Sequence, residues 1–370
     1  MKVLYDHQIF SIQIYGGISR YFVELMKNYE SDDEIEYKLS LEYSNNYYLK
    51  ELNHLSYNTF FENYSFKGKY RLLNLLNILN NKVSKKYISK GDYDIFHPTY
   101  YNPYFLNYLN NKPFVLTIHD MIHEIYPEVF SSKDRTREWK RLLARKAAKI
   151  IAVSENTKKD IIKFLNITEC KIEVVYHGNP FDIYSSHNNL NTILPKKYVL
   201  FVGSRRGYKN FNLFIEAIPT LLAEDSELYI VCAGGGKFTK LEIEKFKNLN
   251  IINKIFYYLV NDTLLINLHK KALAFVFPSL YEGFGIPVLE AFACKCPVIV
   301  GNTSSLPEVA GDAAVYFDPT DKSSMLNSIQ KVIYNDELKK QLINKGTERV
   351  KEFTWGKTAD KTKKIYEEVI

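Results

Sequence analysis

The 370-residue chain is 46% hydrophobic and 25% charged, which is typical of a globular protein large enough for about two domains. No apolar run approaches the roughly 20 residues that a membrane-spanning helix needs, and no signal-peptide pattern follows Met1, so we expect a cytoplasmic protein. The formal net charge of +7 comes without any nucleic-acid-binding motif, so nucleic acid is not an expected partner.

In the first half of the chain, short apolar runs alternate with amphipathic segments such as Ile18–Tyr29, whose apolar residues repeat at helical spacing. This alternation predicts parallel strands covered by helices. The predicted strands are Val3–Tyr5, Tyr93–Phe96, Phe114–Ile118, Lys149–Val153 and Ile172–Tyr176.

A polar, aperiodic segment then separates two blocks of the same pattern. We therefore predict two doubly wound α/β domains: residues 1–184, a linker at 185–197, residues 198–352, and a terminal helix at 353–370 that packs back on the N-terminal domain. The predicted strands of the second domain are Tyr198–Val202, Leu228–Ala233, Phe256–Leu259, Leu273–Phe277, Pro297–Val300 and Ala313–Phe317.

Two basic segments of the N-terminal half carry apolar residues among their cations. The first runs from Lys67 to Lys90, and the second runs from Lys133 to Lys149 and includes Lys140. Basic amphipathic helices can dock on anionic lipid headgroups, which would place the protein at the inner face of the plasma membrane. Ordinary surface helices have the same pattern, so both interpretations stay open.

The most informative motif is the segment 279–290, Ser-Leu-Tyr-Glu-Gly-Phe-Gly-Ile-Pro-Val-Leu-Glu. It follows a predicted buried strand, and Pro287 suits the first position of a helix. Glu282 and Glu290 would face one crevice, where ionised carboxylates accept hydrogen bonds from the hydroxyl pairs of a sugar. A helix start with solvated acids is the simpler alternative. The backbone amides expected to bind a ligand are those of Gly283, Phe284, Gly285 and Ile286.

Two glutamates separated by seven residues resemble the signature of the retaining family 4 glycosyltransferases, which have the GT-B fold of two Rossmann-like domains facing across a cleft. The resemblance covers essentially the whole chain. It includes Tyr-Gly-Gly-Ile-Ser-Arg (15–20), Phe-Val-Gly-Ser-Arg-Arg-Gly-Tyr-Lys-Asn (201–210) and Leu-Pro-Glu-Val-Ala-Gly-Asp-Ala-Ala (306–314). The first of these segments is similar in particular to mannosyltransferases of bacterial O-antigen assembly.

The resemblance implies a role for each matching residue. The first glutamate of the signature contacts the transferred sugar and the second binds the ribose, so these roles fall on Glu282 and Glu290. An arginine and a lysine grip the diphosphate, and Arg205 and Lys209 match them, with the adjacent Arg206 as an alternative. Fixed cations are suited to this role because negative charge develops on the departing nucleotide.

Residues at other strand ends and helix starts complete the expected donor site. Gly16 and Gly17 open the first predicted helix, and His119 follows the strand Phe114–Ile118, where the resemblance implies a contact with the donor sugar. Without the resemblance, a histidine at a strand end is more often packed or capping. The remaining expected donor contacts are Gly203, Ser204, Gly234, Leu259 and Val260.

No metal or other cofactor is expected. His119 and His123 have an i, i+4 spacing, but neither an HExxH motif nor a third ligand accompanies them. The cysteines show no disulfide framework, which favours a reducing compartment. They are Cys170, Cys232, Cys294 and Cys296, and the last two are expected to be buried thiols.

The resemblance implies a retaining transfer of a hexose to a saccharide or lipid-linked acceptor in cell-surface polysaccharide synthesis, with GDP-mannose as the first choice of donor and UDP-sugars as the alternative. Because no nucleophile is evident on the opposite face of the sugar, the expected mechanism is a front-face displacement. An inverting or epimerase-type GT-B enzyme and a non-catalytic nucleotide-sugar-binding relative stay open. A nicotinamide dehydrogenase fits less well because the first strand lacks a GxGxxG turn.

Overall fold

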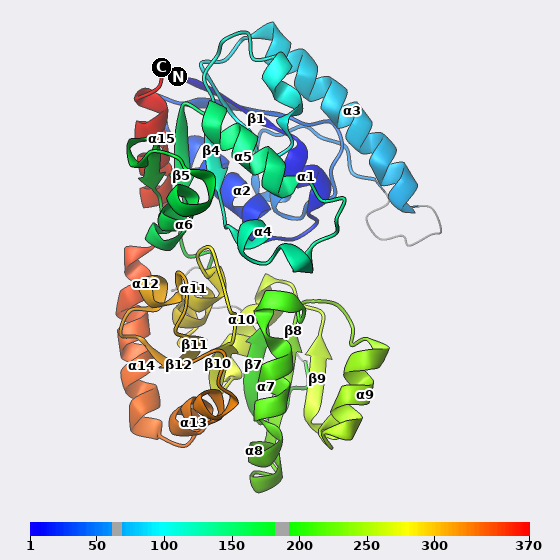
Figure 1. Ribbon diagram of the computed structural model, residues 1–370, viewed down its shortest axis with the longest axis vertical. Coiled ribbons are helices and arrows are strands. Elements are labelled where there is room, and N and C mark those ends of the chain that lie inside the picture. Colours follow the sequence, from blue (N-terminus) through cyan, green and yellow to red (C-terminus); the bar gives the residue numbers. More distant parts are fainter. Residues whose placement is uncertain (61–68, 182–191) are drawn as a thin grey trace. The chain divides into compact units, whose positions relative to one another are not determined.

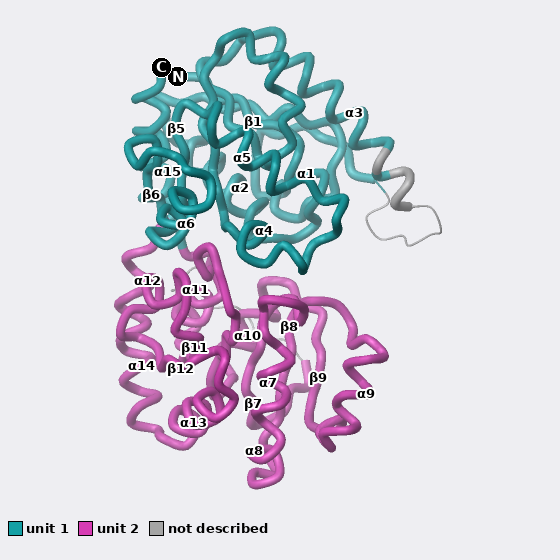
Figure 2. The backbone as a smooth tube through the Cα atoms, viewed as in Figure 1, with its two compact units in different colours: residues 1–178, 355–370 teal, residues 179–354 magenta. Residues whose placement is uncertain are grey.

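The computed structural model describes residues 1–60, 69–181 and 192–370, and it divides the chain into two compact units (Figures 1 and 2). Unit 1 consists of residues 1–178 and 355–370, and unit 2 consists of residues 179–354. The chain thus leaves unit 1 after Gly178 and returns to it at Trp355. Residues 185–191 of the predicted linker lie outside the described residues, as does Lys67 at the start of the first basic segment.

Unit 1 is built on parallel strands in two three-stranded sheets, with the orders β2-β1-β3 and β4-β5-β6. A parallel bridge between Phe96 and Phe114 joins the two sheets. All of these strands except β2 overlap predicted ones. The pattern of β2 is weak because Glu36 and Lys38 are exposed and Tyr37 is only half-buried. The strands are β1 (Lys2–Asp6), β2 (Glu36–Ser40), β3 (Ile95–His97), β4 (Val115–Ile118), β5 (Lys149–Ala152) and β6 (Ile172–Val174).

Helices cover the sheets of unit 1, and the last of them comes from the C-terminal end of the chain (Figure 1). This helix, α15, packs on α2, where the Tyr29 hydroxyl donates to the Ala359 carbonyl at 3.1 Å. The buried Tyr366 hydroxyl lies 3.0 Å from that of Tyr5 and 2.6 Å from His97 Nδ1. The helices are α1 (Gln8–Ile12), α2 (Gly17–Tyr29), α3 (Lys69–Lys90), α4 (Ile122–Ile125), α5 (Thr136–Lys146), α6 (Glu155–Leu165) and α15 (Trp355–Glu367).

Unit 2 contains one parallel six-stranded sheet in the order β12-β11-β10-β7-β8-β9. This is the strand order of a doubly wound Rossmann domain, and it reverses between β7 and β10. The two edge strands are partly exposed and the four inner ones almost wholly buried, but all six read as continuous apolar runs, so every strand overlaps a predicted one. They are β7 (Lys197–Val202), β8 (Leu228–Ala233), β9 (Ile255–Tyr258), β10 (Ala274–Phe277), β11 (Val298–Gly301) and β12 (Ala314–Phe317).

The helices of unit 2 bury their apolar faces against this sheet, and Phe211, Phe214 and Ile329 belong to the resulting core. Cys294 and Cys296 are buried as predicted. The helices are α7 (Phe211–Ala217), α8 (Pro219–Glu224), α9 (Lys240–Asn248), α10 (Asp262–Lys271), α11 (Ile286–Ala293), α12 (Leu306–Ala310), α13 (Lys322–Ile333) and α14 (Asp336–Arg349).

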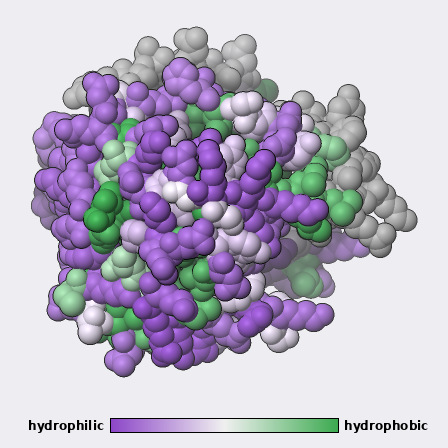
Figure 3. All heavy atoms as spheres, turned by 90° about the horizontal axis from the view of Figure 1, so that it is seen from above, coloured by the Kyte–Doolittle hydropathy of each residue, from purple (hydrophilic) through white to green (hydrophobic). Residues whose placement is uncertain are grey.

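The two basic segments form α3 and α5, but they differ in what they expose. Helix α3 exposes Leu75, Ile78 and Leu79. It lies at the right of Figure 1, and on the same side of Figure 3 a group of hydrophobic side chains lies among hydrophilic ones. In α5, by contrast, Lys140 is wholly buried, which corrects its assignment to a basic surface. None of the helices in the described ranges combines the length and apolarity needed to cross a membrane.

Candidate functional site

The carboxyl ends of β7 and β10 flank the point where the strand order of unit 2 reverses. In open parallel sheets, ligands bind in the crevice at such a point. The loop after β7 spans residues 203–210, and the loop after β10 spans residues 278–285. The Leu280 amide donates to the Tyr208 carbonyl at 2.7 Å, so the backbone itself holds the two loops together.

An ion pair connects these two loops. Lys209 Nζ donates to Glu282 Oε1 at 2.6 Å, and both side chains are largely buried. The Glu282 amide donates to Ser304 Oγ at 2.9 Å. The Ser305 hydroxyl lies 2.9 Å from the Glu282 carbonyl and 2.8 Å from the Phe284 carbonyl. The hydroxyl groups of Ser304 and Ser305 therefore fix the backbone that carries the Glu282 carboxylate at the switch point.

Helix α11 begins directly after this pair, with Gly285 as its N-cap at a φ of 110°. A Cβ atom at Gly285 would lie 3.0 Å from the Leu306 side chain, so this position requires glycine for both its conformation and its space. Pro287 occupies the second helical position, one residue later than predicted. Glu290 lies half-buried in the helix, and Phe284 is buried, so Phe284 can offer a ligand only its backbone.

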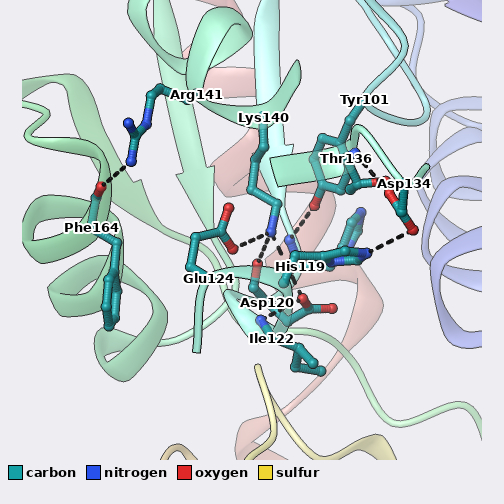
Figure 4. Close-up of polar contacts among 11 residues, drawn as sticks. Tyr101, His119, Asp120, Ile122, Glu124, Asp134, Thr136, Lys140, Arg141 and Phe164 are labelled. Atoms are coloured by element: carbon teal, nitrogen blue, oxygen red, sulfur yellow. Dashed lines mark hydrogen bonds and ion pairs between the residues drawn. The ribbon is translucent and has the colours of Figure 1, made fainter. Parts of the chain in front are cut away.

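In unit 1, His119 lies at the carboxyl end of β4, as predicted, and its side chain is buried (Figure 4). Its amide donates to the Tyr101 hydroxyl at 3.0 Å, and its ring stacks on His177 and meets Tyr21 edge-on. The Nε2 atom of His119 is buried and has no hydrogen-bond partner among the residues that the structure describes. Burial above all, and then nearby positive charge, holds the pKa of His119 well below its usual range, so the imidazole is neutral at physiological pH.

Gly16 is the N-cap of α2, as predicted, but the start of this helix is partly covered by a side chain. Gln13 Oε1 accepts a hydrogen bond from the Ser19 amide at 3.1 Å. A Cβ atom at Gly16 would lie only 2.3–2.8 Å from the Gln13 side chain, whereas Gly17 is exposed. Gln13 therefore covers part of the helix start at which Gly16 and Gly17 were expected to approach the donor, and it already binds the Ser19 amide.

Comparisons with known sequences identify both halves of the chain as parts of a glycosyltransferase. The sequence model described as "Glycosyltransferase Family 4" matches residues 15–180, and that described as "Glycosyl transferases group 1" matches residues 183–349. The chain belongs to glycosyltransferase family 4. It is therefore an enzyme, and its two units form the two Rossmann-like domains of the GT-B fold.

Two relatives and one solved structure of similar fold illustrate the likeness of this glycosyltransferase to known proteins. It is 29% identical to O-antigen chain mannosyltransferase B of Escherichia coli over 290 residues, which cover 74% of each chain. It is 31% identical to O-antigen chain mannosyltransferase RfbU of Salmonella typhimurium over 219 residues, which cover 59% of this chain and 60% of the relative. The crystal structure of Anabaena HepE in complex with UDP and glucose superposes with a TM-score of 0.73 at 16% identity, covering 99% of both chains.

The position of Arg205 in this glycosyltransferase differs from the expectation. Its guanidinium does not meet the Lys209–Glu282 pair but lies beneath the glycine-rich loop after β8. The side chain is only 3% exposed. Its hydrogen bonds run to Glu242 Oε1 at 2.7 Å and to the carbonyls of Gly234 (3.0 Å), Gly236 (2.9 Å) and Lys237 (3.0 Å). Arg205 thus supports this loop, and its predicted contact with a diphosphate is not what the geometry favours.

The other expected donor residues lie at strand ends of unit 2. Gly203 and Ser204 follow β7, with Ser204 exposed, and Arg206 is exposed beside the buried Arg205. Gly234 begins the loop after β8. After β9, Leu259 is 81% exposed and Val260 is half-buried. An exposed leucine next to a strand end offers an apolar surface, but its contact with a nucleotide base stays a prediction.

Sequence reasoning missed several residues that shape the site. Gln13 binds the start of α2 in unit 1, and Ser305 binds the loop after β10 in unit 2, each through a side chain whose reach no local pattern reveals. Glu242 was detectable in part, because Thr239 and Glu242 form a capping box at the start of α9. In the described ranges, no three side chains of His, Cys, Asp or Glu are grouped so that they could hold a metal ion.

Proposed function

We propose that this glycosyltransferase moves a hexose from a nucleotide diphosphate sugar to a saccharide acceptor, with retention of configuration at the anomeric carbon. The observation that carries the proposal is the Lys209–Glu282 ion pair between the loops after β7 and β10, directly before α11. A fixed cation matches the diphosphate of such a donor, and a carboxylate matches the hydroxyl groups of its sugar.

In the proposed mechanism, Lys209 exchanges its bond to Glu282 for the phosphate oxygens of the donor. Glu282 then accepts hydrogen bonds from the transferred sugar, and Glu290 accepts them from the ribose. The bond between the anomeric carbon and the phosphate oxygen breaks, and the acceptor oxygen bonds to that carbon on the same face. The acceptor proton passes to the leaving diphosphate, whose growing charge is stabilised by Lys209 and the amides at the start of α11. No metal is required in this scheme.

Mannose from GDP-mannose is the proposed donor sugar, and cell-surface polysaccharide such as O-antigen is the proposed product. The support is the likeness to two O-antigen chain mannosyltransferases at 29% and 31% identity. A UDP-sugar is the second candidate, since the structurally similar HepE was solved with UDP and glucose.

A binding and product assay on the full chain tests both candidates. We expect GDP to raise the melting temperature more than UDP, ADP or dTDP, and GDP-mannose to be consumed when acceptor is added. NMR of the product should show an α-linkage. Preferential stabilisation by UDP would favour the second candidate, a β-linked product would contradict retention, and loss of turnover on EDTA treatment would contradict metal independence.

We also propose peripheral contact with anionic membrane through α3, at the cytoplasmic face. Its exposed Leu75 and Ile78 lie in the same helix as the exposed Lys82 and Lys86, which suits a surface of anionic headgroups. We expect the protein to sediment with vesicles containing phosphatidylglycerol but not with pure phosphatidylcholine vesicles, and Lys82→Glu/Lys86→Glu to abolish sedimentation. Equal sedimentation of the variant would contradict the proposal.

A further inference from the structure

A charged cluster lies buried behind the turn that carries His119 (Figure 4). Lys140 projects from α5, and its ammonium donates to Glu124 Oε2 at 2.9 Å and to the Asp120 carbonyl at 2.9 Å. The side chains of Lys140 and Glu124 are both 0% exposed. Removing two charges from water is costly, so a wholly buried pair is weak evidence of stabilisation by itself and calls for another explanation.

The ammonium of Lys140 binds the backbone directly after His119 and lies near the ring whose hydroxyl binds the His119 amide. Asp120, whose carbonyl it binds, is the next residue in the chain, and Asp120 Oδ1 in turn accepts from the Ile122 amide at 3.1 Å where α4 begins. The ammonium also lies 5.3 Å from the centre of the Tyr101 ring, whose hydroxyl accepts the hydrogen bond of the His119 amide. Since Nε2 of His119 binds none of the described side chains or backbone groups, its imidazole is placed by this backbone and by ring packing.

We propose that Lys140 is a positioning residue for His119. By fastening the turn from His119 to Glu124 onto α5, it fixes where the neutral imidazole lies at the carboxyl end of β4. The importance of that position for transfer rests on the proposed function, together with the contact between His119 and the donor sugar that the family resemblance implies. The neighbouring cation on the same helix has a different partner: Arg141 is exposed and donates to the Phe164 carbonyl in α6 at 3.3 Å (Figure 4).

The test variant is Lys140→Met/Glu124→Leu, which removes both charges at once, and the matched control is Arg141→Met. Replacing a buried ion pair by apolar side chains often leaves a protein folded, whereas removing one partner leaves a buried charge uncompensated. We expect the test variant to melt cooperatively and to lose about tenfold to a hundredfold in kcat, with the KM for the donor changed by less than about threefold. Arg141→Met should retain the wild-type kcat.

A double-mutant cycle that combines these substitutions with His119→Ala separates positioning of His119 from general stabilisation. In the His119→Ala background, Lys140→Met/Glu124→Leu should lower kcat by less than about twofold further, because the group that it positions is already absent. An equal loss of kcat in both backgrounds would overturn the proposal.

A second readout does not depend on turnover. In protein labelled with 15N at histidine, the ring signals of His119 can be assigned from the spectrum of His119→Asn. We expect Lys140→Met/Glu124→Leu to shift or broaden these signals, and Arg141→Met to leave them unchanged. Unchanged His119 signals in the test variant would overturn the positioning role. Shifted signals in a protein that transfers no sugar would uphold it and contradict only the proposed function.

Discussion

Replacing Arg205 by methionine distinguishes a residue that supports a loop from one that binds a phosphate. The substitution leaves Glu242, whose side chain is 18% exposed, without its cation, and it removes the donors that bind three backbone carbonyls. Breaking a largely buried charged pair by removing one partner costs about 3–5 kcal/mol. For a unit of this size, that loss corresponds to a fall of roughly 6–20 °C in melting temperature.

Differential scanning calorimetry of the wild type, Arg205→Met and the control Arg206→Met measures this effect. Arg206 is exposed, so its substitution should leave the melting temperature unchanged, and it should weaken GDP binding if Arg206 is the phosphate ligand. If Arg205→Met kept the wild-type melting temperature while turnover fell about a hundredfold, Arg205 would be a direct ligand of the diphosphate, and the supporting role would be refuted.

Three further predictions concern the same unit. Glu282→Gln should lower kcat about a hundredfold or more while GDP affinity, measured by calorimetry, stays within about threefold; unaltered kcat would remove Glu282 from the site. Gly285→Ala should lower the free energy of unfolding in urea by about 1–3 kcal/mol, because alanine is strained at a φ of 110°. The control is Gly236→Ser, which also places a side chain at a positive φ but in open space, so it measures the backbone strain without a steric clash. Burial would raise the pKa of Glu242, but the hydrogen bonds from Arg205 and Thr239 outweigh it and lower the pKa below its ordinary 4.5. The ionised Glu242 therefore stabilises the folded state above pH 4.5, and this contribution is lost as the pH falls through the lower folded-state pKa. Arg205→Met should accordingly reduce the loss of melting temperature between pH 5 and pH 3, and an undiminished loss would contradict this assignment.

The sheet of unit 2 was predictable because its inner strands are buried on both faces and its partly exposed edge strands, β9 and β12, are still apolar in sequence. β8 has the predicted bounds, Leu228–Ala233, and the other strands shift by one residue or so at their ends. β2 was not predicted because Glu36 and Lys38 face water, so its sequence contains no apolar run. This segment becomes a strand because it pairs with β1. Such pairing is a tertiary contact, which the local sequence does not reveal.

The candidate site was predictable to the level of residues on loops, but not to the level of side-chain direction. Lys209 and Glu282 meet as a strand-end argument suggests, whereas the adjacent Arg205 and Arg206 could not be told apart because a turn sends neighbouring side chains to different places. The burial of Lys140 did leave a signal. It shares the helical spacing of the buried Thr136, Leu143 and Ala144, a pattern that was hidden by the many cations of α5.

The discontinuity of unit 1 has a consequence for how the chain is made. Unit 2 is complete once residue 354 has left the ribosome, but unit 1 still lacks α15, whose Tyr366 hydroxyl pairs with Tyr5 and His97 in the interior. The half that is synthesised first therefore reaches its native packing last. We expect a nascent chain stalled before Trp355 to expose an unfinished N-terminal core to chaperones and proteases, while the later half is already protected.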